Sequence, residues 1–218
     1  MKLAKPSLPL TFAVLCMAAL PCAHARQAEP DPQAPAQASR SPEQLVKSTI
    51  EGVMAAIRSD PAARAGDPER TYQVVRQTFL PSTDFMLTTQ YAVGPAWASA
   101  TPAQRDALFT QFQILLARTY ALQLTQIRGQ DTRFTYAKPA PLPAGASDAV
   151  VKTSVATGGE VMPIAYRLRK TGAGWKIYDI DMMGAWMIQV YRRQFAAQLS
   201  AGGVDGLIRY LAAHNAAP

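Results

Sequence analysis

Few side chains of this chain belong to the types that nucleophilic or metal chemistry requires. The two histidines are His24, near the N-terminus, and His214, four residues before the end. The two cysteines, Cys16 and Cys22, both fall within the first 25 residues. A Ser–His–Asp or Cys–His system needs a histidine beside the nucleophile, and a zinc site needs several histidine or cysteine ligands. The sequence therefore predicts neither kind of centre, and neither a metal nor another cofactor.

One pair of carboxylates offers an enzymatic interpretation. Asp179 and Asp181 are two residues apart in a segment that alternates like a β-strand, so both side chains point to one face. On a buried face their pKa values would rise, and one could act as a base toward a small hydrophobic substrate. The alternate positions hold Tyr178, Ile180 and Met182, so the apolar face of the strand is the other one. We therefore expect both aspartates to lie outside, in water or salt bridges, and the chain not to be an enzyme.

The N-terminus has the parts of a secretory signal peptide. A short basic segment precedes an apolar stretch at residues 8–20, and Ala23-His24-Ala25 is a small-residue cleavage signature. We expect residues 1–25 to be removed and the mature protein to be exported. Both cysteines then leave with the signal peptide. The mature chain has no disulfide, and its stability must come from a packed core.

A lipid anchor at Cys22 is the alternative at this end of the chain. A lipoprotein signal places a small residue before its cysteine, and Pro21 occupies that position, so we do not expect lipidation. Residues 26–40 are rich in Ala, Pro and Gln, which predicts a disordered linker, and residues 41–214 form a single domain. The net charge of +7 comes from scattered Arg and Lys residues. Such a surface suits anionic lipid or an acidic protein better than nucleic acid.

Capping residues and apolar periodicity predict the helices. Ser41-Pro42-Glu43-Gln44 has the pattern of a capping box and begins a helix over residues 42–57. Further helices are expected from residue 68, over residues 85–92, and from residue 102 to about 125. After the sheet, a helix over about 185–200 stops at Gly202-Gly203, and a last short helix follows.

The middle of the chain changes to a period of two. Four segments alternate between apolar and polar residues, at 134–136, 151–155, 162–168 and 178–182. Glycine-containing turns at 158–159 and 171–174 join neighbouring segments into an antiparallel meander. The predicted fold class is therefore α+β, with a curved antiparallel sheet of about four strands covered by N-terminal and C-terminal helices.

Large apolar side chains gather on the predicted inner face of this sheet and on the helices that cover it. Several are methionines, which adapt to the shape of a flexible ligand. For any one residue the simplest interpretation is an ordinary core. A curved sheet that faces several broadly apolar helices can also enclose a cavity.

Three blocks of residues carry a resemblance to a known family. The blocks are 79–81 with Phe85 and 92–94; 100–105 with Phe109, Phe112, Leu116 and Tyr120; and 175–179 with Gly184, Tyr191, Phe195, Gly203 and Asp205. In this order, and behind a signal peptide, they resemble the MlaC family, also called toluene-tolerance auxiliary proteins, and the resemblance is specific over residues 42–212. Residues 183–187 depart from the family, which usually has an acidic residue before the glycine and small residues after it.

The resemblance implies a function that composition alone does not. MlaC-family proteins are periplasmic phospholipid carriers, so it implies a deep apolar cavity that takes acyl chains while the headgroup stays at the mouth. It also implies lipid shuttling between an outer-membrane lipoprotein complex and an inner-membrane ABC transporter with its substrate-binding subunit, which maintains outer-membrane lipid asymmetry. We expect phospholipid as cargo, only transient contacts with membrane proteins, and a monomer.

We expect the cavity-lining residues to act by dispersion contact and exclusion of water. They are Phe112, Leu116, Tyr120, Val151, Met162, Ile164, Tyr166, Ile180, Met182, Met187 and Tyr191. Three alternatives stay open: a carrier of a hopanoid or another hydrophobic membrane lipid, an enzyme on a cone-shaped α+β scaffold using Asp179 or Asp181, and a periplasmic scaffold without a ligand.

Overall fold

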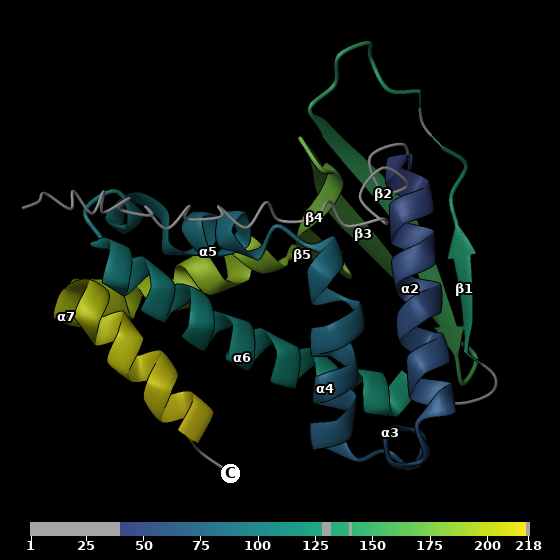
Figure 1. Ribbon diagram of the computed structural model, residues 1–218, viewed down its shortest axis with the longest axis horizontal. Helices are drawn as coiled ribbons and strands as arrows, with labels where there is room; N and C mark the ends of the chain where they lie inside the picture. Colours follow the sequence, from purple (N-terminus) through teal and green to yellow (C-terminus); the bar gives the residue numbers. More distant parts are fainter. Residues whose placement is uncertain (1–39, 128–131, 140, 217–218) are drawn as a thin grey trace, which may run out of the picture. The chain divides into compact units, whose positions relative to one another are not determined.

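Helices occupy both ends of the described chain, and a sheet lies between them in sequence (Figure 1). A computed structural model describes residues 40–127, 132–139 and 141–216. The expected signal peptide at 1–25, and the expected linker at 26–40 apart from Arg40, lie outside the described residues. Within these ranges, no helix is long and apolar enough to cross a membrane.

The helices that start at Pro42 and Pro102 begin where the capping pattern predicts. The Ser41 hydroxyl accepts a hydrogen bond from the Gln44 amide, and the Gln44 side chain accepts one from the Ser41 amide. Thr101 and Gln104 form the same reciprocal pair. Each box satisfies two backbone N–H groups that a helix start leaves without partners. The helices of this half are α2 (Pro42–Ser59), α3 (Pro61–Ala65), α4 (Pro68–Thr78), η1 (Leu80–Ser82), α5 (Phe85–Val93), η2 (Gly94–Trp97) and α6 (Pro102–Ile127).

One curved antiparallel sheet follows, in which each strand pairs with its neighbours in sequence. The α+β class and the four expected strands are confirmed. A two-residue edge strand is added, which is too short for alternation to predict. The strands are β1 (Arg133–Tyr136), β2 (Asp148–Thr157), β3 (Glu160–Thr171), β4 (Gly174–Met182) and β5 (Ala185–Trp186).

Strand β4 contains an irregularity that changes which residues it buries. Asp179 pairs with Arg167 and Ile177 pairs with Leu168, so Tyr178 has no partner in the ladder. An extra residue of this kind is a β-bulge, and it shifts the alternation of side chains between the two faces. Asp179, beyond the bulge, stays on the same face as its partner Arg167 and forms a salt bridge with it. The expectation that Asp179 lies outside was wrong, because the start of α7 covers it and its side chain is fully buried.

The last helix, α7 (Met187–Ala216), is interrupted by two glycines. Gly203 has a φ of 61°, in the left-handed region that glycine adopts without steric cost, and Gly202 is also non-helical. The predicted break between two C-terminal helices is confirmed. The predicted start at residue 185 was wrong by two residues, because Ala185 and Trp186 pair with β4 instead.

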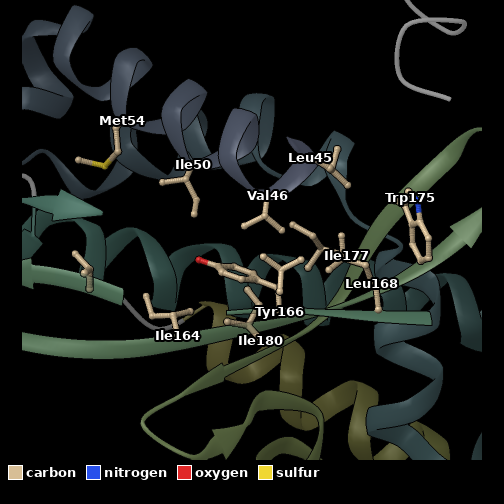
Figure 2. Close-up of a cluster of buried hydrophobic side chains, with 13 residues drawn as sticks. Leu45, Val46, Ile50, Met54, Ile164, Tyr166, Leu168, Trp175, Ile177 and Ile180 are labelled. Carbon is tan, nitrogen blue, oxygen red and sulfur yellow. The ribbon is translucent and has the colours of Figure 1, made fainter. Parts of the chain in front are cut away.

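Two hydrophobic clusters account for most of the described core. In the first, Leu45, Val46, Ile50 and Met54 of α2 pack on the inner face of β2, β3 and β4 (Figure 2). In the second, α5, α6 and α7 pack on one another around aromatic side chains, and we call this the aromatic cluster: Phe85, Phe109, Phe112, Tyr191 and Phe195. Helix α4 packs against both α2 and α6.

Candidate functional site

An apolar cavity lies between α2, the inner face of the sheet and α6. Its volume is about 140 Å³. Packed protein interiors contain few voids larger than one water molecule, so this space is not a packing defect. Helices α4 and α5, strand β1 and the start of α7 complete the wall.

Seven of the predicted residues lie in this wall. Figure 2 shows Ile164 and Tyr166 on the side of the sheet that faces α2. The strands contribute alternate residues, as a pleated sheet requires, and α6 contributes residues one turn apart. Contact between these residues and a lipid stays a prediction. The seven are Leu116, Tyr120, Ile164, Tyr166, Ile180, Met182 and Met187.

The other four predicted residues lie in filled parts of the core. Phe112 and Tyr191 belong to the aromatic cluster, with their ring centroids 5.0 Å apart. Val151 of β2 is buried in the other cluster, between α2 and the inner face of the sheet, and Met162 packs against that same cluster. Helical periodicity and strand alternation identify which side of an element is buried. They do not tell whether the space opposite that side is filled or empty.

The prediction also missed a large part of the wall. Ile50 and Val53 lie at helical spacing on α2, but an apolar stripe of this kind predicts burial and not a cavity. Nothing in the local sequence distinguishes these residues from core residues. The missed residues are Ile50, Val53, Met54, Val75, Phe79, Leu80, Thr83, Phe85, Thr88, Ala117, Leu124, Phe134, Ile177, Tyr178 and Asp179.

Tyr120 and Tyr166 are two of the few polar side chains in a mostly apolar wall. Burial raises the pKa of Tyr120, and it raises the pKa of Tyr166 to about 12. Both side chains therefore stay neutral near neutral pH. A neutral phenol can donate and accept a hydrogen bond, which suits an uncharged polar group such as an ester.

The carboxylate of Asp179 is occupied by partners from the protein itself. One oxygen accepts hydrogen bonds from the backbone N–H groups of Ile180 and Ile188, both at 3.0 Å, and the other accepts one from Arg167 at 3.2 Å. Burial raises the pKa of Asp179 above its ordinary value, and the Ile188 amide and Arg167 oppose that shift. Because Ile188 lies in the first turn of α7, Asp179 anchors this helix on β4.

Asp181 lies in different surroundings. It is partly exposed and accepts a hydrogen bond from the Gly184 amide at 2.8 Å, in the turn between β4 and β5. The two aspartates thus serve separate structural partners. In the part of the chain that the structure describes, no group of three or more His, Cys, Asp or Glu residues could hold a metal ion.

Known proteins resemble this chain over most of its length. The MlaC protein of the intermembrane phospholipid transport system of Haemophilus influenzae is 23% identical over 176 residues, which cover 78% of this chain and 80% of that protein. The toluene tolerance protein ttg2D of Pseudomonas putida is 22% identical over 174 residues, or 77% of each chain.

A solved structure resembles it more strongly. The phospholipid-binding protein of Ralstonia solanacearum, determined in complex with a phospholipid, is 38% identical and has a TM-score of 0.75. The match covers 81% of this chain and 98% of that one. The family model described as MlaC protein matches residues 47–213. The chain therefore belongs to the MlaC family.

Proposed function

We propose that this protein is a periplasmic phospholipid carrier that holds acyl chains in the cavity between α2, the sheet and α6. The apolar cavity carries this proposal. It is supported by the Ralstonia solanacearum protein, which has the same fold at 38% identity and was determined with a phospholipid. Nearly all the wall is apolar, so the interaction with acyl chains is dispersion contact and exclusion of water.

The energetics of acyl chains explain why such a cavity is needed. Each buried CH₂ group is worth about 0.8 kcal/mol, so an acyl chain of about sixteen carbons is stabilised by roughly 12 kcal/mol relative to water. Spontaneous release into water is therefore negligible. A bilayer offers nearly the same apolar surroundings, so the free energy of transfer between carrier and membrane can be close to zero. The direction of transport must then come from partners.

We place the carrier in an ABC transport system that keeps phospholipid out of the outer leaflet of the outer membrane. Its partners would be an outer-membrane lipoprotein complex and the substrate-binding subunit of an inner-membrane transporter. The MlaC relative named for intermembrane phospholipid transport supports this role. The signal peptide predicted at residues 1–25 would deliver the protein to the periplasm.

Organic extraction and mass spectrometry of protein purified without detergent test the proposal. We expect phospholipid in a fixed ratio to protein, and the same spectra would reveal a hopanoid. The variant Ala117→Phe fills the wall from α6 and should lose most of the lipid. The control Ala103→Phe adds the same ring at an exposed position of the same helix and should keep it.

Lipid-free wild-type protein that does not take up phospholipid from vesicles would overturn the proposal. Equal lipid content in Ala117→Phe and wild-type protein, with unchanged circular dichroism, would show that the lipid sits elsewhere. A lipid-free but folded Ala117→Phe protein beside a loaded Ala103→Phe protein would support the cavity as the container.

A further inference from the structure

Most polar side chains in the cavity wall form hydrogen bonds within the protein. The Thr83 hydroxyl donates to the carbonyl of Leu80 at 2.8 Å, and the Thr88 hydroxyl donates to that of Tyr178 at 2.7 Å. The carboxylate of Asp179 accepts the three hydrogen bonds described above. These three side chains are therefore satisfied without a ligand.

The phenol groups of Tyr166 and Tyr178 also have polar neighbours. The Tyr166 hydroxyl shares a hydrogen bond with the Thr153 side chain, which opposes the effect of burial on the pKa of Tyr166. Tyr178 is partly exposed. Burial raises the pKa of Tyr178, and the charges of Asp148 and Arg167 also act on it. Its phenol group therefore lies within reach of charged side chains.

Tyr120 differs from these wall residues. It lies on α6, and no hydrogen bond joins its hydroxyl to another residue within the described ranges. Burial is the main cause of its raised pKa, so bulk water is distant. Among the described residues, the polar side-chain atoms that are sealed from water and lack a partner are Arg105 Nε and Asn215 Oδ1. The Tyr120 hydroxyl is not sealed in this way, so it borders the open space of the cavity.

The hydroxyl of Tyr120 is unfavourable in these surroundings unless it finds a partner. Burial of a hydroxyl without a hydrogen bond destabilises a protein, and phenylalanine would fill the same space without that penalty. Packing alone therefore does not explain a tyrosine at this position. A polar group on the bound molecule would complete its hydrogen bonding while the cavity is filled.

The chemistry of the wall limits which polar group of a phospholipid can serve. No lysine, arginine or histidine is among the described residues that line the cavity. A phosphate would lose its hydration there without gaining a cation. An ester carbonyl is uncharged and accepts hydrogen bonds, and the phenol of Tyr120 can donate one. In a diacyl phospholipid, the esters also lie where the apolar chains begin.

We propose that Tyr120 is a specificity residue whose hydroxyl donates a hydrogen bond to an ester carbonyl of the bound phospholipid. The proposal rests on the carrier function proposed above. It adds that the cavity prefers ester-linked lipids to ether-linked lipids. Because the esters adjoin the glycerol backbone, the same hydrogen bond sets how deeply the acyl chains enter.

Competition between two lipids that differ only in this linkage tests the proposal. Lipid-free protein is incubated with vesicles of equal parts diester phosphatidylcholine and its diether analogue of the same chain length, which has CH₂ in place of each carbonyl. Mass spectrometry of the reisolated protein gives the ratio of the two. We expect about fivefold more diester than diether in the wild type, the effect of one neutral hydrogen bond. Tyr120→Phe should hold nearly equal amounts.

The matched control is Tyr72→Phe, which removes a phenol hydroxyl at a buried position outside the described cavity wall. Tyr72 lies on α4 and packs on Ala117 and Ala121 of α6. This variant should keep the preference of the wild type. Urea unfolding of the lipid-free proteins gives a second measurement. Tyr120→Phe should not lower the midpoint, because its hydroxyl has no partner in the protein to lose.

Loss of the preference in Tyr120→Phe, with the preference kept in Tyr72→Phe, supports the proposal. Equal uptake of both lipids by the wild type would overturn it and leave the carrier function intact. An undiminished preference in Tyr120→Phe, or a clearly lowered urea midpoint, would also overturn it, since the hydroxyl would then serve the protein and not the lipid. Wild-type protein that takes up neither lipid would instead remove the proposed function.

Discussion

The aromatic cluster and the cavity are both built from buried apolar residues, yet the first is filled and the second is hollow. In the cluster, the ring centroid of Phe112 lies 5.0 Å from that of Tyr191, 5.1 Å from that of Phe195 and 5.6 Å from that of Phe85. The rings meet edge to face or tilted, which fills space well. Leu116, one turn further along α6, lines the cavity.

The difference lies in what faces α6 rather than in α6 itself. Helices α5 and α7 approach it closely enough for side chains to interdigitate. On the other side, α4 packs on α6 while α2 packs on the sheet, and α2 and α4 pack on each other. These two helices bridge the sheet and α6 at the side of the cavity. An empty cavity costs stability. The filled cluster must therefore supply the stabilisation that the hollow region does not.

Truncation of a cluster ring should have the largest effect. Phe112 is completely buried, so Phe112→Ala should lower the free energy of unfolding by about 3–5 kcal/mol. Leu124→Ala, at a partly exposed position of the cavity wall on the same helix, should cost about 1 kcal/mol. Urea unfolding followed by circular dichroism measures both. Similar losses would mean that the two regions are packed equally well.

Enlargement of a small residue should also cost more stability in the cluster than in the cavity wall, because only the cavity has room for added atoms. Ala92 of α5 is completely buried in the cluster, so Ala92→Leu should cost about 1–3 kcal/mol through overpacking. Ala117→Leu adds the same atoms to the cavity wall, where there is room, and should cost less than about 1 kcal/mol. It should also reduce the amount of lipid that copurifies. A larger loss of stability in Ala117→Leu would contradict a hollow cavity.

Asp179 tests the connection between the two regions, because it ties α7 of the cluster to β4 of the cavity wall. Asp179→Ala removes a buried acceptor at a helix start and should cost about 1–2 kcal/mol. Asp179→Asn should cost less, since the amide oxygen can still accept from the Ile188 amide. Asp181→Ala, at a partly exposed position near the end of β4, should cost about half a kcal/mol. Thermal unfolding of the three variants gives the order, and an equal loss at both positions would argue against the anchor.

A modest effect is expected from the ionisation of a tyrosine in the cavity wall. Tyr166 has a folded pKa of about 12, above the unfolded value of about 10, so the folded state holds its proton more tightly. Its contribution to stability is complete below about pH 10 and is lost as the pH rises toward about 12. Near pH 11 the wild type should therefore have lost about 1 kcal/mol more than Tyr166→Phe, compared with both proteins near pH 8. Parallel pH profiles would mean that water reaches the Tyr166 hydroxyl.

Much of the fold could be predicted because its signals are local. Ser41 and Gln44 lie three residues apart and satisfy each other's backbone, so the start of α2 depends on nothing distant. Strand alternation and the turn at Gly158-Gly159 similarly predict the pairing of β2 and β3. The bulge at Tyr178 lacks such a signal, since an extra residue leaves the pattern of residue types unchanged.

The candidate site was predictable only in part, for a related reason. The sequence alone determined which faces are apolar, and this was enough to bring Leu116, Ile164 and Met182 to the cavity wall. Only the tertiary structure decided that Phe112 meets other rings while Leu116 meets empty space. Residue type and spacing set how strongly a side chain avoids water. Whether the space opposite that side chain is filled depends on the distance between elements that are far apart in the chain.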